Sequence, residues 1–241
     1  MIRRVAVVIP AANEEQRIGR CLASVDVARA HLYQISANIH VRIVVVLDGC
    51  RDDTAAVATA PDRVQVITIA ARNVGAARRV GASAAMVAAG PLRELWLANT
   101  DADCEVPADW LTQMMAETQQ GAHMVLGTVT PGPDLSPEAR AEWASHYHPR
   151  NGHPHVHGAN FGIRGDVYLA LGGWPPIVTG EDARLARRAA RTGHLRISRT
   201  GSIPVVTSVR RRARAPRGFS SYLRSLGSAA TAGLGSQGGL R

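Results

Sequence analysis

The chain has 241 residues, of which 46% are hydrophobic, and it carries a formal net charge of +9. This hydrophobic content excludes an intrinsically disordered chain and is sufficient for the core of a globular domain. All 28 basic residues are arginine, and aromatic residues make up only 4%, so the charge lacks the stacking surface that many nucleic-acid-binding proteins use. We expect no nucleic-acid partner, and keep an Arg-rich nucleic-acid-binding protein as an alternative.

The apolar runs and the cysteines bear on the location of the protein. The most apolar stretches, such as "VRIVVVL" (41–47), have the length of strands, whereas a membrane span needs about 20 apolar residues. The start of the chain leads into a strand without a small-residue cleavage site. Cys21, Cys50 and Cys104 form no CxxC pair, which favours reduced thiols over a disulfide framework or a zinc site. We therefore expect a cytoplasmic protein.

Apolar runs alternate with helical patterns through the first half of the chain. Strands are expected at 5–10, 41–47, 64–69 and 94–98, and helices at 14–25, 54–60 and about 74–88. Strands without polar alternation, separated by helices, predict an α/β fold with a parallel sheet covered on both faces. Ligands of such sheets bind beyond the carboxyl ends of the strands. Because "PAANEE", "DGCRDD" and "NTDAD" each follow a strand, these three loops are expected to converge.

The second half of the chain has a more mixed pattern. Its expected elements are a helix at about 107–119, a strand at 123–129, a Pro/Gly-rich turn at 130–137, a helix at 138–147, a His-rich loop at 146–160, a short helix, a loop at 172–182 and a helix at 181–192. No internal repeat or linker divides the chain. The segment 209–225 carries six arginines, a charge suited to an anionic membrane surface or substrate.

Two carboxylates, Asp101 and Asp103, follow the strand at 94–98. No GxGxxG turn of the dinucleotide-binding kind follows the first strand, and the chain lacks the GxxxxGK[ST] loop of the common nucleotide triphosphatases. Carboxylates one residue apart on a loop can both reach a hard divalent ion, which then bridges to phosphate oxygens and neutralises leaving-group charge. The pair therefore predicts a Mn²⁺ or Mg²⁺ site.

Five histidines in the loop at 146–157 point to a rival chemistry, a His-site metallohydrolase. On an extended segment His153 and His157 would share one side while His155 points away. A catalytic zinc site needs three protein ligands and an open position. A polar surface loop is the simpler interpretation. A third possibility is that His157 alone adds a ligand to the metal at Asp101 and Asp103.

Taken together, the motifs resemble the family 2 glycosyltransferases, which have the GT-A fold. The resemblance covers roughly residues 4–200 and rests on five ordered stretches, which are "VVIPAANEE" (7–15), "VVVLDGCRDDT" (44–54), "RNVGAARRVGA" (72–82), "ANTDADCEVP" (98–107) and "GGWPPIVTGEDARLARRA" (172–189). It implies a Rossmann-like, mostly parallel central sheet with helices on both faces. We expect a single domain over 1–225, with a nucleotide-binding half (1–106), an acceptor-side half (107–208) and the basic segment 209–225, followed by a flexible, Gly/Ser-rich tail (226–241).

The resemblance also implies roles for individual residues. Asp182 in "GED" matches the catalytic base, with Glu181 as its neighbour, and Asp101 and Asp103 match the DxD metal motif, with Asp103 the direct ligand. The residues expected to bind the nucleotide sugar are Pro10, Ala11, Asn13, Glu14, Asp48, Arg72, Arg78, Asp101, Ala102 and Asn160. The expected reaction moves one sugar from a nucleoside-diphosphate donor, a UDP- or GDP-sugar, to a hydroxyl acceptor.

Several features qualify this expectation. Leu47 and Cys50 replace an acid and a serine that the family often shows, which leaves Asp48 as the one carboxylate of the base pocket. The QxxRW motif of processive synthases is absent, so transfer of a single sugar with inversion is expected, and a retaining reaction remains open. Thr179 and Asp182 have the spacing of a capping box, while Asn13 followed by Glu14 suits the start of a helix, so these residues have structural alternatives.

Overall fold

The computed structural model describes residues 1–87 and 90–209. The chain divides into two compact units. Among the described residues, one comprises 1–87, 90–130 and 149–207, and the other comprises 131–148 with 208–209. The basic segment expected at 209–225 lies, apart from its first residue, outside the described part of the chain, as does the tail at 226–241.

Four parallel strands form one half of the sheet in the larger unit. Residues 5–11 are all buried, which is the pattern of a strand covered on both faces. The strands are β1 (Arg4–Ala11), β2 (His40–Asp48), β3 (Val64–Ile69) and β4 (Leu95–Asn99), and they lie in the order β3-β2-β1-β4. The four predicted strands of the first half are thereby confirmed.

The sheet continues past β4 with strands of mixed direction. Strand β7 (Phe161–Arg164) runs antiparallel to both β4 and β6 (Met124–Pro131). The long strand β8 (Ile197–Thr207) and the short strand β5 (Cys104–Glu105) complete the order β4-β7-β6-β8-β5. Because β7 reverses direction, its first residues lie at the same edge of the sheet as the end of β4. Strands β5, β7 and β8 are not predicted by the sequence analysis.

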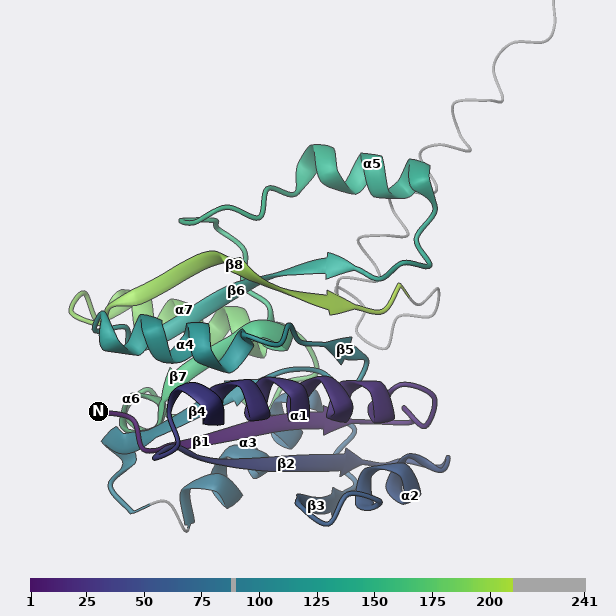
Figure 1. Cartoon of the computed structure of the whole chain (residues 1–241), viewed down its shortest axis with the longest axis horizontal. Helices are drawn as coiled ribbons and strands as arrows, with labels where there is room; N and C mark the ends of the chain where they lie inside the picture. The colour runs from purple at the N-terminus through teal and green to yellow at the C-terminus, as the bar shows by residue number, and fades with distance from the viewer. Residues whose placement is uncertain (88–89, 210–241) are drawn as a thin grey trace, which may run out of the picture. The chain divides into compact units, whose positions relative to one another are not determined.

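Helices cover both faces of the sheet, as expected (Figure 1). Small and apolar side chains of α3 and α7 share one core cluster with the sheet, and α1 packs against α4 on the opposite face. The helices of this unit are α1 (Ile18–Ile35), α2 (Thr54–Thr59), α3 (Val74–Val87), α4 (Trp110–Gln119), α6 (Gly165–Ala170) and α7 (Glu181–Arg191), with 3₁₀ turns η1 (Leu92–Glu94) and η2 (Gly158–Asn160).

The start of α1 differs from the expectation. The helix begins at Ile18 rather than at residue 14, and Asn13 has a left-handed backbone with φ 51° instead of capping a helix. The reason is that the intervening backbone is bound elsewhere, since the amide of Glu14 donates to Thr54 Oγ1 at 2.7 Å and that of Glu15 to Asp52 Oδ2 at 3.2 Å. These residues therefore belong to a loop tied to the loop after β2.

The second unit contains α5 (Pro137–His146). Its N-cap is Ser136, whose hydroxyl accepts from the amide of Ala139 at 3.3 Å, and proline occupies the first turn, where its missing N–H costs nothing. The rings of Trp143 and Tyr147 stack with their centroids 4.8 Å apart. None of the helices in the described ranges is both long enough and apolar enough to span a bilayer.

Candidate active site

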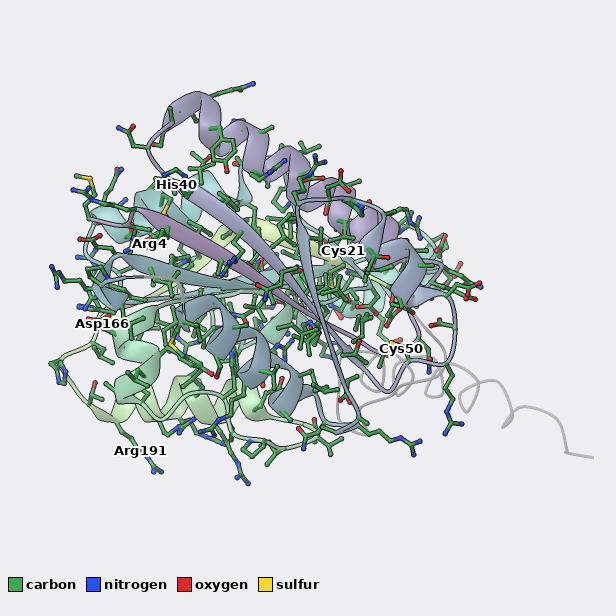
Figure 2. All side chains as sticks on the ribbon, turned by 90° about the horizontal axis from the view of Figure 1, so that it is seen from below. Arg4, Cys21, His40, Cys50, Asp166 and Arg191 are labelled. Atoms are coloured by element: carbon green, nitrogen blue, oxygen red, sulfur yellow. The ribbon has the colours of Figure 1, made fainter. Side chains whose placement is uncertain are left out.

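The loops after β1 and β2 interlock at the carboxyl edge of the parallel strands. Asn13 Oδ1 accepts from the amide of Arg51 at 2.7 Å, and the amide of Asn13 donates to Cys50 Sγ at 3.5 Å. Figure 2 shows Cys50 at the opposite end of these strands from Arg4 and His40. The convergence of the first two polar loops is therefore confirmed.

Asp48, at the end of β2, organises the loop after β3. Its side chain is buried, and its two carboxylate oxygens accept from the amides of Arg72 at 2.7 Å and Asn73 at 2.6 Å. These bonds hold Arg72 in a left-handed conformation with φ 50°, which costs a non-glycine residue on the order of 1 kcal/mol or more. The Arg72 side chain is exposed at this edge, where a ligand of the loops could meet it.

The residues expected at the nucleotide differ in accessibility. Pro10, Ala11, Glu14 and Ala102 are buried, so they can offer mainly backbone groups to a ligand. Asn13 is exposed. The predicted contacts of these residues with a donor stay predictions.

The acid pair lies in the turn between β4 and β5. One ligand atom from each of Asp101, Asp103 and Cys104 lies within 4.8 Å of the others. Burial raises the pKa of the Cys104 thiol well above its ordinary value, so at neutral pH the thiol stays protonated and the two carboxylates are the available ligands. Oxygen ligands are those that Mn²⁺ and Mg²⁺ prefer. The residues present therefore fit the predicted cofactor.

Arg78 of α3 connects the acid pair to the start of α7. Only 2% of Arg78 is exposed, and its Nη2 and Nη1 form ion pairs with Asp101 Oδ1 and Glu181 Oε1. The Trp174 ring lies beside the guanidinium, with Arg78 Cζ 5.4 Å from the ring centroid. Burial raises the pKa of Glu181, and the charge of Arg78 opposes that shift. Sequence reasoning missed both Trp174 and the burial of Arg78, although "GGW" was among the quoted stretches.

Asp182 is held by two backbone groups. Its Oδ2 accepts from the amide of Gly158 at 2.8 Å, and its Oδ1 accepts from the amide of Ala183 at 2.7 Å. The capping-box interpretation is wrong, because the N-cap of α7 is Gly180, with φ 78° and no side-chain cap from Thr179. Asp182 is partly exposed whereas Glu181 is buried, so only Asp182 presents a carboxylate to the edge of the site.

The start of α3 is docked onto the loop that precedes α7. The amide of Gly75 donates to Ile177 O at 3.2 Å, and Asn73 Nδ2 donates to Pro176 O at 2.9 Å. A Cβ on Gly75 would lie 2.1 Å from Pro175 O, so only glycine permits this approach. The loop at 172–182 is thereby fastened to the start of α3.

The His-rich loop does not assemble a metal site. The rings of His153 and His155 stack at 5.6 Å, and those of His155 and His157 at 6.1 Å. The expected alternation of sides is therefore wrong, because the segment is not a strand. Burial lowers the pKa of His157 to about 4. Within the described ranges, no histidine joins a group of three metal-ligating side chains, and the group at Asp101 and Asp103 does not include His157.

Asn160, the last residue of η2, is buried in the core. Its Nδ2 donates to Thr128 O at 2.8 Å and to Ile203 O at 2.6 Å, while its Oδ1 accepts from Trp110 Nε1 at 2.9 Å. The side-chain amide thus connects β6, β8 and α4, and both its nitrogen and its oxygen have hydrogen-bond partners. Its expected contact with the donor sugar stays a prediction.

The sheet and its acidic loops define the GT-A class of glycosyltransferase folds. The family described as Glycosyl transferase family 2 matches residues 6–165. The chain therefore belongs to glycosyl transferase family 2, a family of glycosyltransferases, and the resemblance inferred from its sequence is confirmed.

Solved structures share this fold at low sequence identity. TarS 1–349 from S. aureus superposes with a TM-score of 0.60 and 14% identity, over 86% of this chain and 60% of that chain. The chain thus spans less than two thirds of the TarS structure. Glucosyl-3-phosphoglycerate synthase from Mycobacterium tuberculosis, in complex with Mn²⁺, uridine diphosphate and phosphoglyceric acid, gives a TM-score of 0.56 at 17% identity, over 97% and 79% of the two chains. No curated protein matches the sequence.

Proposed function

We propose that the protein is a metal-dependent glycosyltransferase that moves a single sugar from a nucleoside-diphosphate donor to a hydroxyl acceptor, with inversion of the anomeric carbon. Family membership supports the reaction class. The observation that carries the proposal is the contact of Arg78 with both Asp101 and Glu181, because it joins the acid pair to the helix that bears Asp182. A metal loop and a candidate base thereby belong to one site.

The acid pair would hold the metal beside the donor diphosphate. A Mn²⁺ or Mg²⁺ ion on Asp103 and Asp101 would neutralise the charge that develops on the departing diphosphate. The loop 10–14 and Asp48 would surround the base and ribose, and the exposed Arg72 would contact the base or a phosphate. Because a solved structure of the same fold contains uridine diphosphate, we propose a UDP-sugar before a GDP-sugar.

Asp182 would take the proton of the acceptor hydroxyl. Its two backbone hydrogen bonds fix the direction of the carboxylate, and its partial exposure lets an acceptor approach. Glu181 cannot serve equally, because it is buried and paired with Arg78. Asp182 would thus act as a general base. The deprotonated hydroxyl would attack the anomeric carbon from the side opposite the departing diphosphate, and this attack inverts the configuration of that carbon.

A thermal-shift panel of UDP, GDP and dTDP, each with and without Mn²⁺, tests this proposal. A nucleotide that binds only the folded state raises the melting temperature, because at 100 times its Kd it stabilises the protein by about 2.7 kcal/mol. We expect UDP to give the largest shift and Mn²⁺ to enlarge it. If none of the three shifts the melting temperature with Mn²⁺ present, the assignment of a nucleotide-sugar site is wrong.

The basic segment 209–225 would place the enzyme at the cytoplasmic face of an anionic membrane. The free thiols of the three cysteines suit a reducing compartment, and arginines near an anionic surface contribute about 1 kcal/mol each.

Replacing Arg210, Arg211 and Arg212 with glutamine should therefore weaken sedimentation with anionic vesicles and leave UDP binding intact. The control removes the same charge from the exposed face of α7 at Arg184, Arg187 and Arg191. Equal loss in both triple variants would show general charge attraction rather than a membrane-binding segment.

A further inference from the structure

The guanidinium of Arg78 is buried and bound to carboxylates of the protein itself. It lies within α3, its exposed fraction is 2%, and each of its terminal nitrogens binds a carboxylate of the protein. The exposed Arg72, six positions earlier, is free of this enclosure. The sequence analysis expected both arginines to contact the donor, but the two side chains lie in different environments.

The two carboxylates bound by Arg78 come from distant parts of the chain. Asp101 lies 23 positions from Arg78 and belongs to the loop after β4, whereas Glu181 lies 103 positions away and begins α7. The Asp101 side chain remains 36% exposed, so it can contact a ligand while Arg78 binds its Oδ1. Glu181, only 4% exposed, holds the other side of the guanidinium inside the protein.

The same guanidinium contacts the backbone that holds Asp182. A Cβ on Gly158 would lie 2.5 Å from Arg78 Cζ, Nη1 and Nη2, so the guanidinium lies directly against Gly158. The amide of Gly158 in turn donates to Asp182 Oδ2. One buried side chain therefore contacts a candidate metal ligand, the start of α7 and the peptide that orients the candidate base.

Stability alone does not explain this arrangement. A buried ion pair is often no more stabilising than apolar side chains of the same volume, because desolvation of the charges offsets their attraction. Here Arg78 Nε is also buried without a hydrogen-bond partner, which adds to the cost. An ion pair of this kind can instead serve to impose a specific geometry on the groups that it binds.

We propose that Arg78, anchored by Glu181, is a positioning residue that fixes Asp101 for metal binding and sets its place relative to Asp182. This inference rests on the proposed function. Groups that hold a metal ligand in place typically contribute about 10–100-fold to metal affinity or activity. Arg78 is such a group, because it binds the carboxylate of the candidate metal ligand Asp101.

The test compares Arg78→Lys and Glu181→Gln with wild type and with Arg79→Lys, which changes the exposed neighbouring arginine of α3. Lysine keeps the positive charge but lacks the two terminal nitrogens with which arginine binds two carboxylates. Glutamine keeps the shape of Glu181 and removes its charge. Three quantities are measured, namely Mn²⁺ affinity in the presence of UDP by electron paramagnetic resonance, UDP affinity without metal, and UDP release from the sugar donor.

We expect Arg78→Lys to weaken Mn²⁺ binding and lower kcat by about 10–100-fold each, with metal-free UDP affinity unchanged. Glu181→Gln should act in the same direction, and it carries the test alone if Arg78→Lys does not fold. Arg79→Lys should match wild type. Unchanged Mn²⁺ affinity in the folded variants would overturn the positioning role, and so would a loss of metal-free UDP affinity, which would place Arg78 at the donor. Failure of wild type to bind Mn²⁺ with UDP would instead refute the proposed function itself.

Discussion

Replacing Asp182 with asparagine is expected to reduce sugar transfer by a factor of about 100 to 10,000, the range for loss of a general base. Asparagine keeps one oxygen to accept a backbone N–H but cannot take a proton at neutral pH. Its NH₂ group will face either Gly158 or Ala183, whose amides now donate to the carboxylate. We therefore expect a modest loss of stability alongside the loss of rate, with UDP affinity close to wild type.

Asp166→Asn provides a matched control for this change. Asp166 lies in the first turn of α6, and its Oδ1 accepts from the amide of Val167 at 2.8 Å, as Asp182 does from Ala183. Figure 2 places Asp166 near the end of the strands marked by Arg4, away from Cys50. The control should lose about 0.3–1 kcal/mol of unfolding free energy, the usual contribution of an acid in the first turn of a helix, at unchanged turnover. If Asp182→Asn retains activity within a few-fold of wild type, Asp182 is not the base and a retaining reaction gains support.

Replacing Asp103 with alanine is expected to abolish the part of nucleotide binding that depends on metal and to lower turnover by about 100–1,000-fold, the usual cost of losing one group that stabilises developing negative charge. The chain has no lysine, so no lysine can take over that role at the diphosphate. The measurement is the thermal shift with UDP in Mn²⁺ and in chelator.

Glu105→Ala is the control for Asp103→Ala. Glu105 is an exposed acid two positions further on, and it pairs with Arg20 at the surface. Its removal changes the local charge equally, yet should leave the Mn²⁺-dependent shift intact. An Asp103→Ala protein that still shows the full difference between Mn²⁺ and chelator would contradict the metal assignment.

Much of the first half of the fold follows from the sequence because β1, β4 and most of β2 are buried on both faces. The runs at 5–10 and 41–47 contain almost only apolar residues, and the structure places them as interior strands of the sheet. Parallel strands end at one edge, so the meeting of the loops after β1 and β2 could be predicted without knowing any distance. The acid pair was recognisable from its spacing on the loop after a strand, and the family resemblance added the role expected for the "GED" stretch.

The rest could not be predicted for specific physical reasons. Strand β8 contains Gly201 and Pro204, and its buried positions alternate only over its last five residues, so most of it lacks the pattern of a strand. The sequence around Arg78 reads as an Ala-rich helix, on which an arginine is ordinarily solvated. The buried charge of Arg78 is paired with Glu181, which lies 103 positions away. Local sequence patterns carry no information about such a partner.

The Arg78–Glu181 pair also has a consequence for the order in which the protein can be completed during synthesis. Strands β1–β4 and helix α3 have all been synthesised by residue 99, long before α7 exists. Until α7 docks, Arg78 lacks one of its two carboxylates, and burying an incompletely paired charge is costly. Contacts over such separations also form slowly, because a long loop must close first. A nascent chain that ends before Glu181 thus contains β1–β4 and α3 but lacks the second carboxylate of Arg78, so the candidate site is completed only after α7 has been synthesised.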